Sequence, residues 1–310
     1  MKLLLENGAE VNAKGGKYGN ALQAALIGDN DAAWLGDNDA AWLGDNEVIV
    51  KLLLENGAEV NAEGGEYGNA LQAASCQGNE VIVKLLLENG ADVNAKGGKY
   101  GNALQAALTG DMTTWFGFNE EILKLLLENG AEVNAKVGEY GNALQAASLK
   151  GNEAIVKLLM EHGAKVNENG GIYGNTLQAA SFRGNEAIMK LLLENGAEVN
   201  AKGGKYGNAL QAALIGDKAT CQWFGFNEGI VKLLLETGAE VNAKGGEYGN
   251  ALQAASFKGN EAIVKLLLEN GAEVNAKGGK YENALQAALF SGAEAVVKLL
   301  LEASGKQHAS

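Results

Sequence analysis

A unit of 33 residues recurs along the chain with few changes, and this period constrains the fold more than any other feature. One marker, K-L-L-L-E-N-G-A-E-V-N-A or a close copy, recurs for example at Lys51 and again at Lys84. A second marker, G-N-A-L-Q-A-A, recurs in step with the first, and its last copy begins with Glu282 in place of glycine. A fixed period of this length indicates a stacked array, because no single unit can bury its apolar face alone.

We therefore expect one repeat domain over residues 1–310. It consists of a partial repeat over residues 1–18 and of repeats that start near residues 19, 68, 101, 141, 174, 207, 249 and 282. Three departures from the period predict insertions at about residues 29–45, 111–118 and 217–226, each between the two helices of a repeat. We expect a monomer or a fragment of a longer chain, since Met1 falls inside a second helix whose first helix is missing from the sequence.

Each unit encodes two short helices and a turn. Asn69 and Gln72 have the spacing of a capping box and predict the start of a first helix. Glu80 and Lys84 form an i, i+4 pair on a second helix, which Gly90 is well placed to end. The glycine-rich segment that follows suits a hairpin turn.

This order of helix, turn, helix and hairpin at a period of 33 resembles the ankyrin repeat. The family pattern T-P-L-H-x-A-A appears here as N-A-L-Q-A-A from Asn69 to Ala74, and the resemblance runs from Lys2 to about Glu302. The departures are systematic, since Asn, Ala and Gln replace Thr, Pro and His, and the chain has no proline. The resemblance implies an all-α repeat solenoid, a curved and elongated array of helix-turn-helix units with a β-hairpin or loop.

The combination of the motifs Y-G-N-A-L-Q-A-A and E-N-G-A-E-V-N-A resembles the repeat arrays of fungal ankyrin proteins. Many of those carry an upstream nucleotide-binding domain of the NACHT type and resemble innate-immune receptors. The phosphate-binding pattern G-x-x-x-x-G-K-[ST] is absent from this sequence.

Three positions vary on this repeated frame: two at the end of the first helix and one at the hairpin tip. By resemblance to the ankyrin family, they lie on the concave face that binds partners. Variation on a constant frame suits a tunable recognition surface, although neutral change at solvated positions would give the same pattern. We therefore predict partner binding at Gln77, Lys150, Phe182, Arg183, Phe257 and Lys258 on the helices, and at Lys99, Glu139, Ile172, Lys205 and Glu247 on the tips.

The insertions hold bulky aromatic residues that do not follow the period. These residues are alternative anchors for a partner, since tryptophan is enriched at interface hot spots, or they fold back over the helix ends. The alternative site consists of Trp34, Trp42, Trp115, Phe116, Trp223 and Phe224.

Composition excludes several classes of function. A net charge of −13 disfavours nucleic acid and anionic membrane surfaces as partners. Cys76 and Cys221 occupy non-equivalent places, so we expect no disulfide framework and an intracellular, cytoplasmic protein. No Cys/His cluster has the spacing of metal ligands and no nucleophile set can be assembled, so we predict no enzymatic activity, metal or cofactor.

Two hypotheses about function follow. The first is a protein–protein interaction module that binds an unidentified protein through its concave face and hairpin tips. The second is the ligand-sensing C-terminal arm of a nucleotide-switched, NACHT-type receptor or signalling protein, here without its switch domain.

Overall fold

The computed structural model describes residues 3, 6–27, 40–109, 120–216 and 228–307. Within these ranges the regular elements are helices, and the only paired extended residues form isolated bridges across hairpins, such as that between Gly64 and Gly68. The chain divides into two compact units, Met1–Glu139 (unit 1) and Tyr140–Ser310 (unit 2).

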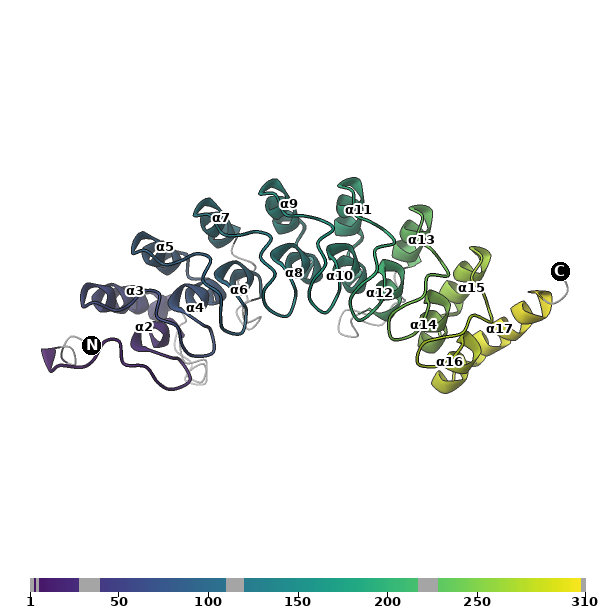
Figure 1. The fold of residues 1–310 in the computed structure, drawn as a ribbon, viewed down its shortest axis with the longest axis horizontal. Coiled ribbons are helices and arrows are strands. Elements are labelled where there is room, and N and C mark those ends of the chain that lie inside the picture. Colours follow the sequence, from purple (N-terminus) through teal and green to yellow (C-terminus); the bar gives the residue numbers. More distant parts are fainter. Residues whose placement is uncertain (1–2, 4–5, 28–39, 110–119, 217–227, 308–310) are drawn as a thin grey trace. The chain divides into compact units, whose positions relative to one another are not determined.

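Unit 1 contains three helix pairs, drawn from purple to teal in Figure 1. Its first helices pack side by side, as do its second helices. The first helices are α2 (Ala21–Ala24), α4 (Ala70–Gln77) and α6 (Ala103–Thr109); the second helices are α3 (Ala40–Glu55), α5 (Glu80–Glu88) and α7 (Glu120–Glu128).

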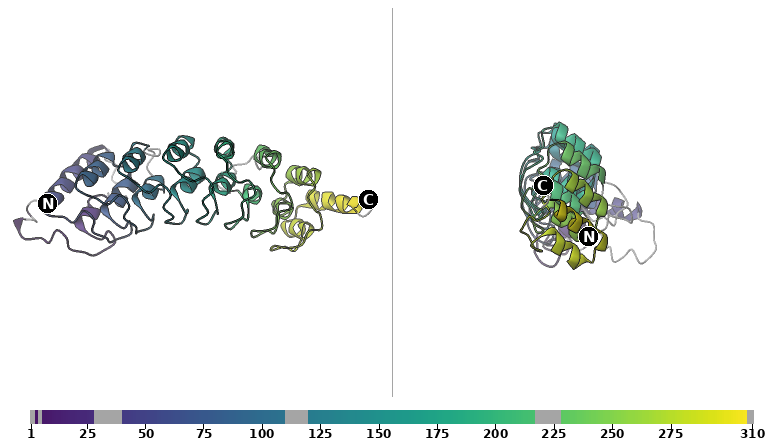
Figure 2. Two further views of the ribbon diagram at one scale, coloured as in Figure 1. Left: turned by 45° about the horizontal axis from the view of Figure 1, so that its top comes forward. Right: turned by 90° about the vertical axis from the view of Figure 1, so that its right-hand side faces the viewer.

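The described part of unit 2 contains five helix pairs, with its first helices in one row and its second helices in another, and its hairpin loops lie on one side of the helices in Figure 2. Its first helices are α8 (Ala143–Lys150), α10 (Thr176–Arg183), α12 (Ala209–Ile215), α14 (Ala251–Lys258) and α16 (Ala284–Ser291). Its second helices are α9 (Glu153–Glu161), α11 (Glu186–Glu194), α13 (Glu228–Glu236), α15 (Glu261–Glu269) and α17 (Glu294–Gln307).

The predicted asparagine caps are confirmed, but the two-way capping box forms in only some of the described first helices, since Oε1 of Gln23, Gln211 and Gln253 accepts no hydrogen bond within the described part of the chain. In α4 the Asn69 side chain accepts a hydrogen bond from the backbone N–H of Gln72, and the Gln72 side chain accepts one from the N–H of Asn69. The helix ends at Gly78, whose φ of 75° is left-handed. The same two-way box caps α8 and α10.

The ends of two predicted segments need comment. Helix α3 begins at Ala40, so the last residues of the first predicted insertion, 40–45, are helical. Their sequence, A-A-W-L-G-D, contains alanines and a leucine that favour extension of the helix. Of the lone helix predicted near the start, the described residues Leu3 and Glu6 are helical.

Aliphatic side chains form the core between the two rows. Leu71, Ile82 and Leu86 are almost completely buried, and Leu104 on α6 is only 1% exposed. Alanines on the same first helices are equally buried and let neighbouring helices approach closely.

The capping glutamine also joins one repeat to the next. In α4 the amide Nε2 of Gln72 donates to the carbonyl oxygens of Ala95 and Gly101, at 3.0 and 3.4 Å. These acceptors lie on the hairpin that leads into α6, the next first helix, so one buried side chain both caps its helix and fixes the stacking. The same link is made by Gln23, Gln145, Gln178, Gln211 and Gln253.

The asparagine of V-N-A makes a second link between repeats. Nδ2 of Asn61 donates to the Gly90 carbonyl at 3.0 Å, and its Oδ1 accepts from the Asp92 N–H at 2.8 Å. The Gly90 carbonyl belongs to the turn that ends the following second helix, so the pair of bonds sets the register of the stack. Asn12, Asn94, Asn167, Asn200 and Asn242 repeat this link.

The first glycine of G-N-A-L-Q-A-A is required by the next hairpin. At Gly68, where φ is 97°, a Cβ would lie 1.9 Å from Oε1 of Gln72 and 2.9 Å from the backbone of Gly97. Glu282 takes this place in the last repeat with a φ of 65°. No hairpin of the described chain packs on Glu282, so a side chain fits there.

Candidate protein-binding face

The helix-end phenylalanines of unit 2 lie between tyrosine rings. The Phe182 ring centroid is 5.1 Å from that of Tyr173 and 4.8 Å from that of Tyr206. Phe257 lies in the same way between Tyr248 and Tyr281, at 5.2 and 5.0 Å. Because each tyrosine belongs to a hairpin of its own repeat, the phenylalanines link first helices to two neighbouring hairpins.

Both phenylalanines are half-buried, whereas Phe290 at the equivalent place in α16 is 72% exposed. The sequence alone treats Phe182 and Phe257 as surface residues whose loss leaves folding intact. The ring contacts contradict this expectation, since truncation to alanine would remove packing against two tyrosines. The tyrosines are also partly desolvated, and burial, followed by the charge of Glu247, raises the pKa of the Tyr248 hydroxyl.

The lysines at the ends of the first helices of unit 2 have different environments. Nζ of Lys258 donates to the carbonyl oxygen of Ile215 at 2.9 Å, at the end of α12. Lys150, at the end of α8, is half-buried and lies near enough to Arg183, at the end of α10, for the two positive charges to repel each other. Burial first, and the nearby Arg183 second, lower the pKa of the Lys150 ammonium.

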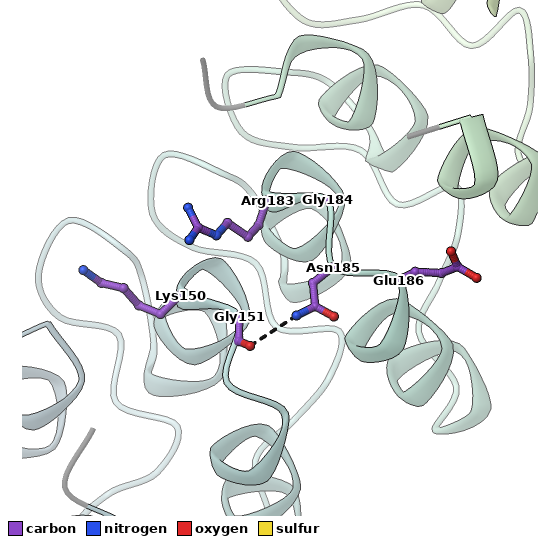
Figure 3. Close-up of a pocket in the computed structure, with 6 residues that line it drawn as sticks. All are labelled: Lys150, Gly151, Arg183, Gly184, Asn185 and Glu186. Carbon is purple, nitrogen blue, oxygen red and sulfur yellow. Dashed lines mark hydrogen bonds between the residues drawn. The ribbon is translucent and has the colours of Figure 1, made fainter. Parts of the chain in front are cut away.

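A cavity of about 360 Å³ lies beside Lys150 and Arg183. It is lined by these two residues and by Gly151, Gly184, Asn185 and Glu186. Lys150 and Arg183 extend to the same side in Figure 3, whereas Glu186 extends to the other. Two of the lining residues are joined by a hydrogen bond, in which Nδ2 of Asn185 donates to the Gly151 carbonyl at 3.2 Å.

The hairpin tips interact chiefly with one another. Nζ of Lys99 is 3.4 Å from Oε1 of Glu66 on the preceding tip. In unit 2 a carboxylate oxygen of Glu247 is 3.9 Å from Nζ of Lys205, and another is 3.6 Å from Nζ of Lys280. Exposed pairs of this kind contribute at most about 1 kcal/mol, yet they explain why Lys and Glu occupy successive tips.

The remaining predicted residues lie apart from the ring clusters. In unit 1, Gln77 is half-buried at the end of α4, next to the buried Cys76 that stands where unit 2 has phenylalanine. Glu139 is exposed at the last tip of unit 1, and Ile172 is 42% exposed at a tip of unit 2.

The alternative site cannot be compared with the structure. Trp34, Trp115, Phe116, Trp223 and Phe224 lie outside the described residues. Trp42 is part of α3, and its side chain is likewise outside the described part.

Two kinds of site are not found in the described ranges. No three His, Cys, Asp or Glu side chains in them are grouped so that they could hold a metal ion. Among the same residues, no helix combines the length and the apolar character that a membrane crossing needs.

The sequence pattern does not foresee that Lys150 and Arg183 line the same pocket. Each residue occupies the same variable position in its own repeat, so their proximity follows once adjacent first helices are known to pack. The partial burial of Lys150 has no signal in the sequence, because it depends on how neighbouring repeats pack.

Comparison with known proteins identifies the repeat. A family model of ankyrin repeats (three copies) matches residues 38–137, 112–203 and 217–309. The crystal structure of the human ASB11 ankyrin repeat domain is similar at 28% identity with a TM-score of 0.58, covering 74% of this chain and 96% of that chain. No curated protein sequence matches the chain. The narrower resemblance to fungal arrays with a NACHT-type domain is not tested by these matches and stays a prediction.

Proposed function

This chain belongs to the ankyrin-repeat family, and we propose that it binds a protein partner through the first-helix ends and hairpin tips of unit 2. Ankyrin repeats are generally protein–protein interaction modules, so the class of function follows from the family. The location of the site is our own inference from the residues that vary between repeats.

The stacked rings are the observation that carries this proposal. Phe182 and Phe257 are held by two tyrosines each, yet part of each ring remains exposed. Aromatic side chains that are already ordered lose little conformational entropy when a partner packs on them. Aromatic and arginine side chains are also enriched among the residues that dominate binding energy.

The experiment starts from a partner captured with the full chain. Because Phe→Ala would disturb the tyrosines, we would change Phe182 and Phe257 to leucine, the residue at the equivalent Leu149. Arg183 and Lys258 would become glutamine, the residue at the equivalent Gln77. We expect the four changes together to weaken binding by ~2 kcal/mol or more, as measured by calorimetry, with the helical circular dichroism signal retained.

The alternative site supplies the control. Replacing the inserts at 113–118 and 220–226 with short Gly/Ser loops should have the smaller effect on affinity. If the shortened inserts abolish binding and the four changes do nothing, the aromatic insertions are the recognition element and our assignment is wrong.

The second hypothesis, a sensing arm of a nucleotide-switched receptor, stays a prediction. No contact among the described residues favours it over a free-standing module, and its test is the coding sequence upstream of Met1. The predicted cytoplasmic location, the monomeric state and the exclusion of nucleic acid as a partner are likewise proposals.

A further inference from the structure

Two pairs of aromatic rings in unit 2 have the same geometry. In the first ring pair, Phe182 is stacked on Tyr206, with ring centroids 4.8 Å apart and an angle of 15° between the ring planes. In the second ring pair, Phe257 is stacked on Tyr281 at 5.0 Å and the same angle of 15°. In both pairs the ring at the end of a first helix lies against the tyrosine of the hairpin that follows.

A lysine of a hairpin tip lies beside each ring pair. Nζ of Lys205 is 5.8 Å from the ring centroid of Tyr206, and Nζ of Lys280 is 5.5 Å from that of Tyr281. Both lysines are exposed, and Glu247 on the tip between them offsets only one of the two charges. The combination of a ring pair and a cation therefore occurs twice in unit 2, as two equivalent subsites.

The repeat between the two ring pairs interrupts the pattern. Helix α12 ends in Ile215, at the place that Phe182 and Phe257 take in α10 and α14. The two subsites are therefore separated by two steps of the stack. Because the axes of packed helices are about 8–10 Å apart, two steps correspond to ~16–20 Å.

The two rows of helices in unit 2 differ in charge. All charged residues of its first helices are basic, namely Lys150, Arg183 and Lys258. The second helices α9, α11, α13 and α15 each begin and end with a glutamate and contain one lysine. The first helices of unit 1 as described, α2, α4 and α6, contain no charged residue. Positive charge on the first helices thus occurs in the unit that has the two ring pairs.

We propose that this face of unit 2 binds an extended, acidic polypeptide segment that packs one apolar side chain on each ring pair. The proposal rests on the protein-binding function of the face and names the chemistry and the spacing of the segment. An extended chain advances about 3.3 Å per residue, so the two apolar residues should be about five or six positions apart. Acidic residues near them would interact with the tip lysines and the basic ends of the first helices.

The ring geometry favours a polypeptide over a single-stranded nucleic acid. Bases bind to proteins by stacking on aromatic faces. In each ring pair one face of each ring is already covered by the other ring, and Phe182 also lies 5.1 Å from the ring of Tyr173. The net charge of −13 repels a polyanion at long range, whereas a short acidic segment is attracted by the local positive charge of this face.

The test begins with a displayed library of random peptides selected against the full chain. Peptides of about 16 residues are long enough for an extended chain to span both subsites. Selected peptides would be synthesised, and their affinities would be measured by fluorescence anisotropy for the chain and its variants. Phe182→Leu and Phe257→Leu each alter one ring pair and introduce the residue found at Leu149 in α8.

Charge is tested by a matched pair of double variants. Lys205→Gln combined with Lys280→Gln removes the two tip lysines of the subsites. Lys157→Gln combined with Lys232→Gln is the control, since it removes the same charge from α9 and α13, where each lysine pairs with a glutamate at 2.6 Å. We expect the tip variant to weaken peptide binding about threefold or more and the control to change it less than about twofold.

We expect selected peptides to carry two apolar anchors about five or six positions apart, with Asp or Glu nearby. Phe182→Leu and Phe257→Leu should each weaken binding about threefold or more, and the double variant should show about the product of the two effects, because the subsites are far apart. Replacing one peptide anchor with alanine should cancel the effect of one leucine variant and preserve the effect of the other.

The spacing is tested by deletion. Removing three residues between the anchors should reduce the affinity to that of a peptide with a single anchor, because the shortened chain cannot reach both subsites. If the affinity survives this deletion, or if a single anchor binds as tightly as two, the pair of subsites is wrong. The proposed binding face still stands in that case if either leucine variant weakens binding.

Three further results would overturn the proposal. Selected peptides without acidic residues, together with normal binding by the tip variant, would exclude an acidic partner. A single-stranded oligothymidylate that binds more tightly than every selected peptide would replace the polypeptide with nucleic acid. If selection yields no peptide that responds to Phe182→Leu or Phe257→Leu, both the subsites and the proposed binding face are wrong.

Discussion

The first helices of units 1 and 2 begin in the same way but end in different residues. In both units an asparagine caps the helix and a buried glutamine reaches into the next repeat. Helix α4 of unit 1 then ends in Cys76 and Gln77, a buried thiol and a neutral amide, whereas α10 of unit 2 ends in Phe182 and Arg183. The two units therefore share one frame and differ at the face, which indicates that stacking and recognition depend on separate residues.

The strongest test of the shared frame is the core leucine of the first helix. Leu104 in unit 1 and Leu177 in unit 2 are each only 1% exposed. Changing either to alanine should reduce the free energy of unfolding by ~2–5 kcal/mol, measured by urea denaturation, because each leaves a cavity.

Hydrogen exchange would show where this loss falls. Since repeats contact mainly their neighbours, faster exchange should be confined to the altered repeat and those next to it. Uniformly faster exchange along the chain, or a much larger effect in one unit, would contradict a frame made of equivalent repeats.

The glutamine link predicts a smaller effect with an internal control. Gln178→Ala removes two hydrogen bonds to the next repeat, at 2.9 and 3.3 Å, and should destabilise the chain by ~1–3 kcal/mol. Gln286 in the last repeat is exposed and makes no such link in the described chain, so Gln286→Ala should cost less than about 0.5 kcal/mol. Equal losses at the two positions would mean that neither these bonds nor the capping box of Gln178 contributes to stability.

The ring cluster should distinguish the face of unit 2 from that of unit 1. Phe182→Ala should cost ~1–3 kcal/mol, because the half-buried ring loses contact with Tyr173 and Tyr206. Phe182→Leu retains much of the volume and should cost under ~1.5 kcal/mol. In unit 1, Cys76→Ala should reduce the free energy of unfolding by less than Phe182→Ala does. A larger reduction would show that the Cys76 thiol contributes more to packing than the Phe182 ring.

Most of the frame could be predicted from the sequence, because its signals are local. The capping box and the glycine ends of the helices depend on residues within a few positions of one another, and both were found as predicted for α4. The links made by Gln72 and Asn61 were not predicted, since their acceptors are backbone carbonyls that every sequence possesses.

The candidate face was predicted less completely. Variation between repeats indicated Phe182, Arg183 and Lys150 as residues of one surface, but it carried no information on burial. The stacking of Phe182 between tyrosines and the engagement of Lys258 by the Ile215 carbonyl depend on the distance between neighbouring repeats. That distance is set by packing of the alanine-rich first helices, which no single repeat specifies.

The smallest predicted effect concerns Lys150, whose charge opposes folding. Because its pKa is lowered in the folded chain, the unfolded chain binds the proton more tightly, and stability should rise as the pH increases toward the usual lysine value of 10.5. At pH values below the lowered pKa, Lys150 is charged in both states and the full destabilisation is present. Lys150→Gln should therefore raise the free energy of unfolding at neutral pH, by less than about 1 kcal/mol because the side chain is only partly buried.

Lys258→Gln is the matched change in α14 and should have the opposite sign, since it removes the hydrogen bond to Ile215. Thermal unfolding of both variants at neutral and at alkaline pH would measure the difference. A lysine that weakens the fold, where a neutral residue would not, is the pattern of a position that serves binding at the expense of stability. If Lys150→Gln instead destabilises the chain as Lys258→Gln does, Lys150 is a structural residue, and the two helix ends of unit 2 have the same role.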